Sequence, residues 1–110
     1  MTLSIITTVL NNEKFIYDCV NSVKKQRFNK KYEHIVVDGG SNDNTLKILR
    51  KFKKENKNLK IFEKKRLGIY EGINYAIKKS KYNYIGILHS DDFYKNNKVF
   101  KSILEEFKLD

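Results

Sequence analysis

The chain has 110 residues, 40% of them hydrophobic and 13% aromatic, and its 23 basic and 13 acidic residues give a net charge of +10. This length allows one domain with one core, and the apolar content argues against low-complexity disorder. No stretch approaches the roughly 20 apolar residues of a membrane-spanning helix. The single cysteine, Cys19, excludes an internal disulfide and fits a reducing, cytoplasmic setting.

Basic residues are concentrated in one region, since ten of the 23 lie between Lys47 and Arg66. One interpretation is a solvated helix face, and the other is a patch that contacts an anionic membrane surface from the cytoplasmic side. The basic residues do not alternate with an aromatic stacking platform, which argues against a nucleic-acid partner.

Four predicted strands alternate with four predicted helices along the chain. The strands are short aliphatic runs without strict alternation, which is typical of strands buried on both faces. They cover residues 3–8, 33–38, 59–62 and 84–88. The helices have apolar residues at helical spacing, within residues 15–23, 46–52, 69–77 and 99–107. This order predicts an α/β fold, a Rossmann-like, mostly parallel sheet of about four strands with helices on both faces.

Polar side chains follow three of these strands. Thr8 and Asn11 come after the first strand, Asp38 after the second, and Asp91 and Asp92 after the fourth. In an open parallel sheet, ligands bind beyond the carboxyl ends of the strands. We therefore expect these residues at one rim of the sheet.

Two motifs at this rim carry possible chemistry. In Ser90-Asp91-Asp92, adjacent carboxylates repel each other unless a cation is present, and Mg²⁺ or Mn²⁺ takes such oxygens together with substrate phosphates. The alternative is that Ser90 or Asp91 only caps the next helix. Asp38 precedes two glycines and could accept hydrogen bonds from a base or ribose, although an ordinary Asx turn would have the same sequence.

Taken together, the motifs resemble the family 2 glycosyltransferases, which have the GT-A fold. The resemblance covers essentially the whole chain and rests on four blocks in the same order and spacing as in the family. The blocks are residues 4–11, 35–45, 68–77 and 84–92.

The resemblance implies a role for each matching residue. Asp92 would bind Mg²⁺ or Mn²⁺ that bridges the donor diphosphate, and Asp91 would contact the ribose or orient the metal shell. Thr8 and Asp38 would lie against the nucleotide, usually uridine, and Asn11 belongs to the nucleotide-contacting loop. Tyr70 and Asn74 would line the donor pocket.

Three positions depart from the family pattern. Gly39 stands where many relatives have a second aspartate that often reads the base, so the identity of the base is open. Ser90 stands at the first position of the metal motif, which leaves Asp92 as the expected ligand. Leu10 replaces an aromatic residue of the first loop.

Family members are inverting enzymes whose general base is a carboxylate in the acceptor-binding half, which would lie beyond Asp110. We therefore expect residues 1–110 to form the nucleotide-sugar-binding half of the domain without its acceptor half. The expected function is transfer of a sugar from a nucleotide-sugar to a glycan or lipid-linked acceptor in bacterial polysaccharide or glycoconjugate synthesis, with poor transfer by this chain alone. The alternatives are a nucleotidyltransferase-like domain and a non-enzymatic module that docks on membranes.

Overall fold

The computed structural model describes residues 2–109, and side chains as far as residue 106. Asp110 and the side chain of Phe107, the last residue of the fourth predicted helix, lie outside this description. Strands and helices alternate in the order β1 (Leu3–Val9), α1 (Ile16–Lys24), β2 (Tyr32–Asp38), α2 (Thr45–Glu55), β3 (Leu59–Glu63), α3 (Ile69–Lys79), β4 (Tyr84–Ile87) and α4 (Val99–Leu109). The predicted α/β fold is confirmed.

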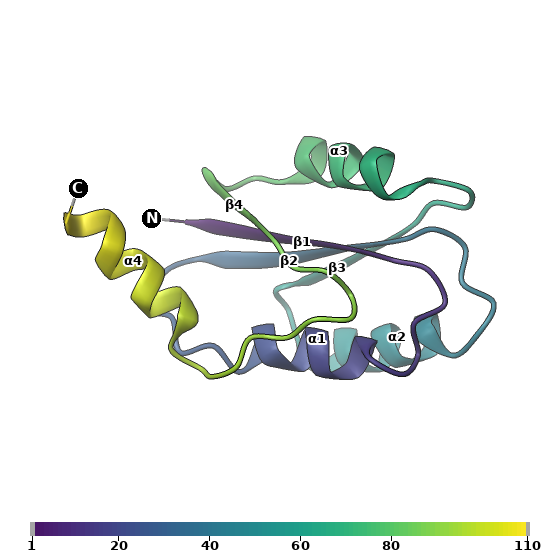
Figure 1. The fold of residues 1–110 in the computed structure, drawn as a ribbon, viewed down its shortest axis with the longest axis horizontal. Coiled ribbons are helices and arrows are strands. Elements are labelled where there is room, and N and C mark those ends of the chain that lie inside the picture. The colour runs from purple at the N-terminus through teal and green to yellow at the C-terminus, as the bar shows by residue number, and fades with distance from the viewer. Residues whose placement is uncertain (1, 110) are drawn as a thin grey trace.

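The four strands form one parallel sheet in the order β3-β2-β1-β4. The chain therefore moves outward from β1 through β2 to β3, and then returns to the other side of β1. Figure 1 shows α1 and α2 below the sheet and α3 above it. Because the direction of winding reverses at β1, the carboxyl ends of β1 and β4 flank the topological switch point where such folds bind ligands.

The core has two parts because the sheet is covered on both faces. Below the sheet, Leu3 and Ile5 of β1 pack with the apolar stripe of α1 and with Leu49 and Phe52 of α2. Above it, the alternate residues of the strands pack under α3. This upper cluster consists of Ile6, Ile35, Val37 and Ala76. Burial on both faces explains why the strands read as continuous aliphatic runs.

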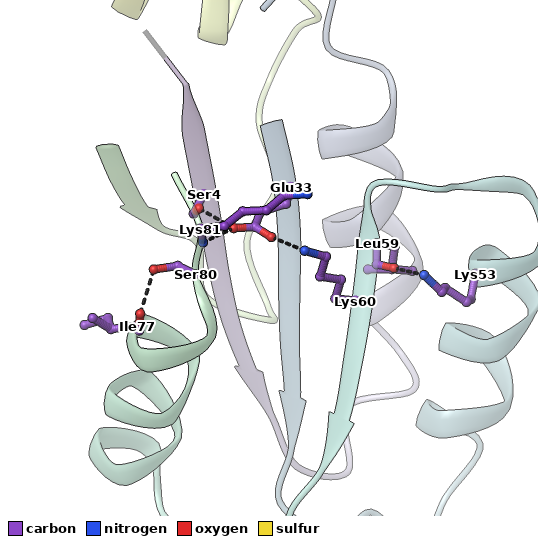
Figure 2. Close-up of polar contacts among 8 residues, drawn as sticks. All are labelled: Ser4, Glu33, Lys53, Leu59, Lys60, Ile77, Ser80 and Lys81. Carbon is purple, nitrogen blue, oxygen red and sulfur yellow. Dashed lines mark hydrogen bonds and ion pairs between the residues drawn. The ribbon is translucent and has the colours of Figure 1, made fainter. Parts of the chain in front are cut away.

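Glu33, near the start of β2, is buried on the α3 side of the sheet with 1% of its surface exposed. Its carboxylate accepts hydrogen bonds from Ser4 Oγ at 2.6 Å, Lys60 Nζ at 2.6 Å and the backbone amide of Lys81 at 2.8 Å (Figure 2). Burial raises the pKa of Glu33, but these hydrogen bonds outweigh burial and the net pKa lies below its usual value. The cluster joins the amino-terminal ends of three strands to the turn after α3.

Among residues 2–109, no helix has the length and apolar character to cross a bilayer. The outer strand β4 is the least covered part of the sheet, with Tyr84, Ile85 and Ile87 each 41–51% exposed.

Candidate functional site

A cavity of about 610 Å³ lies at the carboxyl ends of the strands, on the α3 side of the sheet. Its wall combines the ends of β1 and β2, the loop that enters α3, and the segment after β4. The lining residues are Thr8, Val9, Leu10, Asn12, Val37, Gly39, Leu67, Gly68, Ile69, Gly72, His89, Ser90, Asp91 and Asp92. The predicted convergence of several β–α junctions at one rim is therefore present in the structure.

Two glycines allow α3 and its loop to approach the sheet closely. A Cβ atom added at Gly72 would lie 2.8 Å from Thr8 Cγ2, so any larger residue would push α3 away from β1. A Cβ atom at Gly39 would lie 2.9 Å from the carbonyl oxygen of Leu67. Both distances are shorter than normal van der Waals contact. The absence of side chains at positions 39 and 72 therefore sets the shape of the cavity.

Asp91 and Asp92 lie on the cavity wall and are solvent-exposed. The turn that carries them follows β4 directly, with Leu88 N donating to Ile6 O at 2.9 Å and Asp92 N to His89 O at 3.0 Å. None of the ion pairs among the described residues involves either carboxylate. Both carboxylates are therefore available to a cation.

Within residues 2–109, no three histidine, cysteine, aspartate or glutamate side chains cluster closely enough to hold a metal by themselves. Two neighbouring carboxylates nevertheless fit a Mg²⁺ or Mn²⁺ ion that takes its remaining ligands from substrate phosphates and water. This donor set fits a metal that binds together with an anionic ligand.

Thr8 is half-buried on the cavity wall, whereas Asp38 lies within its own turn. Asp38 is 0% exposed, and its Oδ1 accepts from the amides of Gly40 and Ser41, each at 2.8 Å. Its Oδ2 accepts from Ser41 Oγ at 2.6 Å. Asp38 ends β2 at the cavity rim but does not line the cavity; its neighbour Gly39 does.

Asn11 also acts within the loops and lies outside the cavity lining. Its backbone has the left-handed φ of 49°, and its Oδ1 accepts from the amides of Asn42 at 2.6 Å and Asp43 at 3.3 Å. Asn11 thereby joins the loop after β1 to the turn after β2. This role has no sequence signal beyond the preference of asparagine for such backbone conformations.

Tyr70 and Asn74 are placed by the structure on the exposed surface of α3, outside the lining of the cavity, and Tyr70 is 81% exposed. The cavity is instead lined by Gly68, Ile69 and Gly72. Successive residues of a helix point about 100° apart, so residues 70 and 74 share a face that is turned away from residues 68 and 72. The family resemblance implied a place in the donor pocket for these two residues, and the lining of this cavity does not include them.

Several site features were not anticipated from the sequence. Asn12 lines the cavity, and its Nδ2 donates to Ser90 Oγ at 2.9 Å.

Ser22 and Gln26, four residues apart at the end of α1, hold the chain that follows Asp92. Their contacts are Tyr94 N to Ser22 Oγ at 3.0 Å, Gln26 Nε2 to Asn96 O at 2.7 Å and Phe100 N to Gln26 Oε1 at 3.0 Å. The sequence signal that could have indicated these contacts is the spacing of Ser22 and Gln26, two polar residues beside the apolar stripe of α1.

Cys19 Sγ donates to His89 O at 3.6 Å, close to Asp91 and Asp92, but its thiol is not reactive. Burial raises the pKa of Cys19 to about 12, a hydrogen bond with Thr7 opposes this shift, and the charges of Asp92 and Asp91 add to it. A thiol with this pKa stays protonated near neutral pH, so Cys19 belongs to the core and not to a nucleophilic site.

The parallel sheet, the helices on both faces and the rim cavity define a Rossmann-like α/β protein of the GT-A type. The family described as "Glycosyl transferase family 2" matches residues 4–110, so the chain belongs to this family. The resemblance inferred from the four sequence blocks is confirmed, and the family assignment argues against the nucleotidyltransferase-like alternative.

Two relatives are named as a glucosyltransferase and a synthase. The chain is 38% identical over 96 residues to a poly(ribitol-phosphate) beta-glucosyltransferase of Bacillus spizizenii, a match that covers 84% of this chain and 15% of that protein. It is 33% identical over 108 residues to a chondroitin synthase of Escherichia coli, covering 98% of this chain and 16% of that protein.

Solved structures show the same fold. The Staphylococcus aureus TarS structure in complex with UDP-GlcNAc superposes with a TM-score of 0.88 at 31% identity, covering 99% of this chain and 32% of that one. A mannosyltransferase from Pyrobaculum calidifontis, in complex with GDP-Man and Mn²⁺, has a TM-score of 0.85 at 20% identity, covering 94% and 31%. The chain thus spans about a third or less of the length of these proteins.

Proposed function

We propose that this chain is the donor-binding part of an inverting glycosyltransferase that takes a sugar from a nucleotide-diphospho-sugar for a cell-surface polysaccharide or glycoconjugate. The observation that supports this proposal most directly is the cavity wall, where the carboxylates of Asp91 and Asp92 share one pocket with the start of α3. Family membership and the nucleotide-sugars named for the TarS and mannosyltransferase structures point in the same direction.

The metal in this proposal is Mg²⁺ or Mn²⁺, held by Asp92 with help from Asp91. The chemistry that the ion supplies is charge neutralisation on the diphosphate as the leaving group forms. Neither carboxylate forms an ion pair with a basic side chain among the described residues. Their negative charge therefore attracts the metal ion to the rim.

The start of α3 suits the diphosphate of the donor. Gly68 and Ile69 lie on the cavity wall, and the first turn of a helix presents free amides and a partial positive charge to anions. Glu71 Oε2 accepts from Gly68 N at 2.8 Å and fixes the beginning of the helix. The metal and the helix would then compensate the diphosphate charge from two sides of one pocket.

The nucleoside in this proposal, uridine, lies between Thr8, Gly39 and Leu67. Asp38 contributes indirectly, because its carboxylate is used to shape the turn that presents Gly39. The uridine assignment is supported by UDP in a TarS complex at 31% identity.

The acceptor hydroxyl in this proposal belongs to a glycan or a lipid-linked saccharide. An inverting transfer needs a general base that removes the hydroxyl proton as the oxygen attacks the anomeric carbon. We assign this base to an acceptor-binding half outside residues 1–110.

Peripheral contact with the cytoplasmic face of a membrane is a second element of the proposal. Residues 47, 50, 51, 53 and 54 place exposed basic side chains along α2. Of these five side chains, only Arg50 has an ion pair within the part of the chain that the structure describes, with Glu63 at 2.9 Å. A basic helix face of this kind is attracted to anionic lipids, which would bring the enzyme to a lipid-linked acceptor.

Calorimetry of UDP binding, with and without Mn²⁺, tests the donor site. We expect Mn²⁺ to strengthen UDP binding, and Asp92→Ala to remove most of that gain. Glu105→Gln on α4 is the matched control, because it removes one exposed negative charge outside the cavity. Wild-type binding without metal dependence, or equal UDP affinity in wild type and Asp92→Ala, would contradict the proposal.

A further inference from the structure

The acidic segment, residues 89–92, is connected to the rest of the rim by Asn12. We infer that Asn12 is a positioning residue: it holds the acidic segment in place and thereby sets the affinity of Asp91 and Asp92 for a divalent cation. The effect on the cation rests on the proposed function, whereas the restraint on the segment can be measured without any ligand.

The first step in the argument is that the loop after β1 and the turn after β2 form one firm unit, here called the loop platform (residues 11–13 and 41–45). Among the described residues, six hydrogen bonds of 2.6–3.3 Å join the two halves. The donor–acceptor pairs are Asn11 N–Ser41 Oγ, Asn12 N–Thr45 Oγ1, Glu13 N–Asp43 Oδ2, Asn42 N–Asn11 Oδ1, Asp43 N–Asn11 Oδ1 and Asn44 N–Glu13 Oε2. Such a network resists local movement.

The acidic segment has fewer restraints. Among the described residues, one hydrogen bond between side chains ties it to the loop platform, from Asn12 Nδ2 to Ser90 Oγ at 2.9 Å. The thiol of Cys19 also donates to His89 O, at 3.6 Å, and a thiol is a weak donor. The Asn12–Ser90 bond is therefore the main side-chain link between the platform and the two carboxylates.

This link is suited to hold carboxylates next to a metal without competing for it. Both side chains are neutral, so they add no charge beside Asp91 and Asp92. The carboxylates themselves are exposed and would otherwise sample many orientations. Fixing the segment before the cation arrives lowers the entropy lost on binding, which is how residues behind metal ligands raise metal affinity.

Asn12→Ala removes the link selectively, because the other hydrogen bonds of Asn12 within residues 2–109 use its backbone. Its amide donates to Thr45 Oγ1 at 3.0 Å, and its carbonyl accepts from the amides of Phe15 and Ile16. The substitution therefore removes the link to Ser90 and leaves the loop platform and the start of α1 in place.

Two measurements on the full chain test the inference. Amide hydrogen exchange without ligand should be faster in residues 89–92 of Asn12→Ala by about tenfold, while exchange in the loop platform stays unchanged. Calorimetry with Mn²⁺ and UDP should show a loss of metal-dependent affinity of about 10-fold, the lower end of the range for residues behind metal ligands. Because Asn12 also lines the cavity, the quantity compared is the gain in UDP affinity on adding Mn²⁺, measured in each protein against its own metal-free value.

Ser90 provides the matching half of the test. Ser90→Ala should reproduce the effects of Asn12→Ala, and the double variant should be no worse than either, because all three lack the same bond. Ser90→Thr keeps the hydroxyl, so its hydrogen exchange and its metal-dependent UDP affinity should stay as in the wild type. Additive losses, or unchanged exchange in residues 89–92 of Asn12→Ala, would overturn the inference. Wild-type UDP binding without metal dependence would instead contradict the proposed function, and the exchange measurement would still decide the positioning role.

Discussion

Lys60 Nζ lies 2.6 Å from Glu33 Oε1, so an ion pair links β3 to β2 at the opposite end of the sheet from the cavity (Figure 2). The lysine side chain is 33% exposed, whereas the glutamate is almost completely buried. A buried carboxylate is tolerated only while its hydrogen bonds are present. The pair therefore makes the stability of the sheet sensitive to one lysine.

Lys60→Met should lower the free energy of unfolding by about 2 kcal/mol, because it leaves the buried Glu33 carboxylate without its charged partner. Urea unfolding near neutral pH measures this loss. Lys57→Met is the control, since Lys57 is exposed and has no ion pair among the described residues. Equal unfolding curves for wild type and Lys60→Met would show that the pair contributes nothing to stability.

His34 should make the protein less stable below about pH 6.5. The imidazole is fully buried, its Nδ1 has no hydrogen-bond partner among the described residues, and burial lowers its pKa from 6.5 to about 3. Between these two values the unfolded chain binds a proton that the folded chain does not, so stability falls as the pH falls. The expected loss is about 1.4 kcal/mol per pH unit.

Urea unfolding of wild type and His34→Gln at about pH 7.5 and about pH 5.5 isolates this effect. Glutamine can still reach Thr7 Oγ1, which lies 2.8 Å from His34 Nε2, and it does not titrate. The difference in stability between the two proteins should shift in favour of the variant at the lower pH. A pH-independent difference would mean that His34 has the same pKa in the folded and the unfolded chain, contrary to the effect of its burial.

Gly72→Ala should weaken both stability and donor binding. The added methyl group would sit 2.8 Å from Thr8 Cγ2 and would push α3 away from β1, which typically costs about 1–3 kcal/mol. Thr8→Ser removes the opposing methyl group but keeps the hydroxyl, so the double variant Gly72→Ala with Thr8→Ser should recover much of the lost stability. Thermal unfolding and UDP calorimetry measure the two effects, and the prediction fails if Thr8→Ser gives no recovery.

Asp38→Ala distinguishes a structural role for this carboxylate from a direct nucleotide contact. The substitution leaves the amides of Gly40 and Ser41 without their acceptor, so the free energy of unfolding should fall by about 2 kcal/mol. Asp38→Asn retains one oxygen for these amides and should be milder in stability and in UDP affinity. If Asp38 reads the nucleotide directly, Asp38→Asn would instead lose UDP affinity at unchanged stability.

Much of the fold could be predicted because each strand is a short aliphatic run bounded by polar residues. The four strands, the four helices and their order agree with the structure, and the differences are confined to the ends of elements. For example, α2 extends from Thr45 to Glu55, beyond the apolar residues 46–52 that indicated it. Helix ends depend on local hydrogen bonds, which hydrophobic spacing does not report.

The amino-acid sequence by itself determined that polar residues follow the strands, and a parallel sheet brings strand ends to one rim regardless of the details of packing. Only the tertiary structure decided which of those residues face the cavity. The rotation of α3 turned Tyr70 and Asn74 away, and the turn after β2 enclosed Asp38. The packing of two loops brought Asn12 to Ser90, 78 residues apart in the chain. Such choices depend on contacts between distant segments, and no local pattern of residues encodes them.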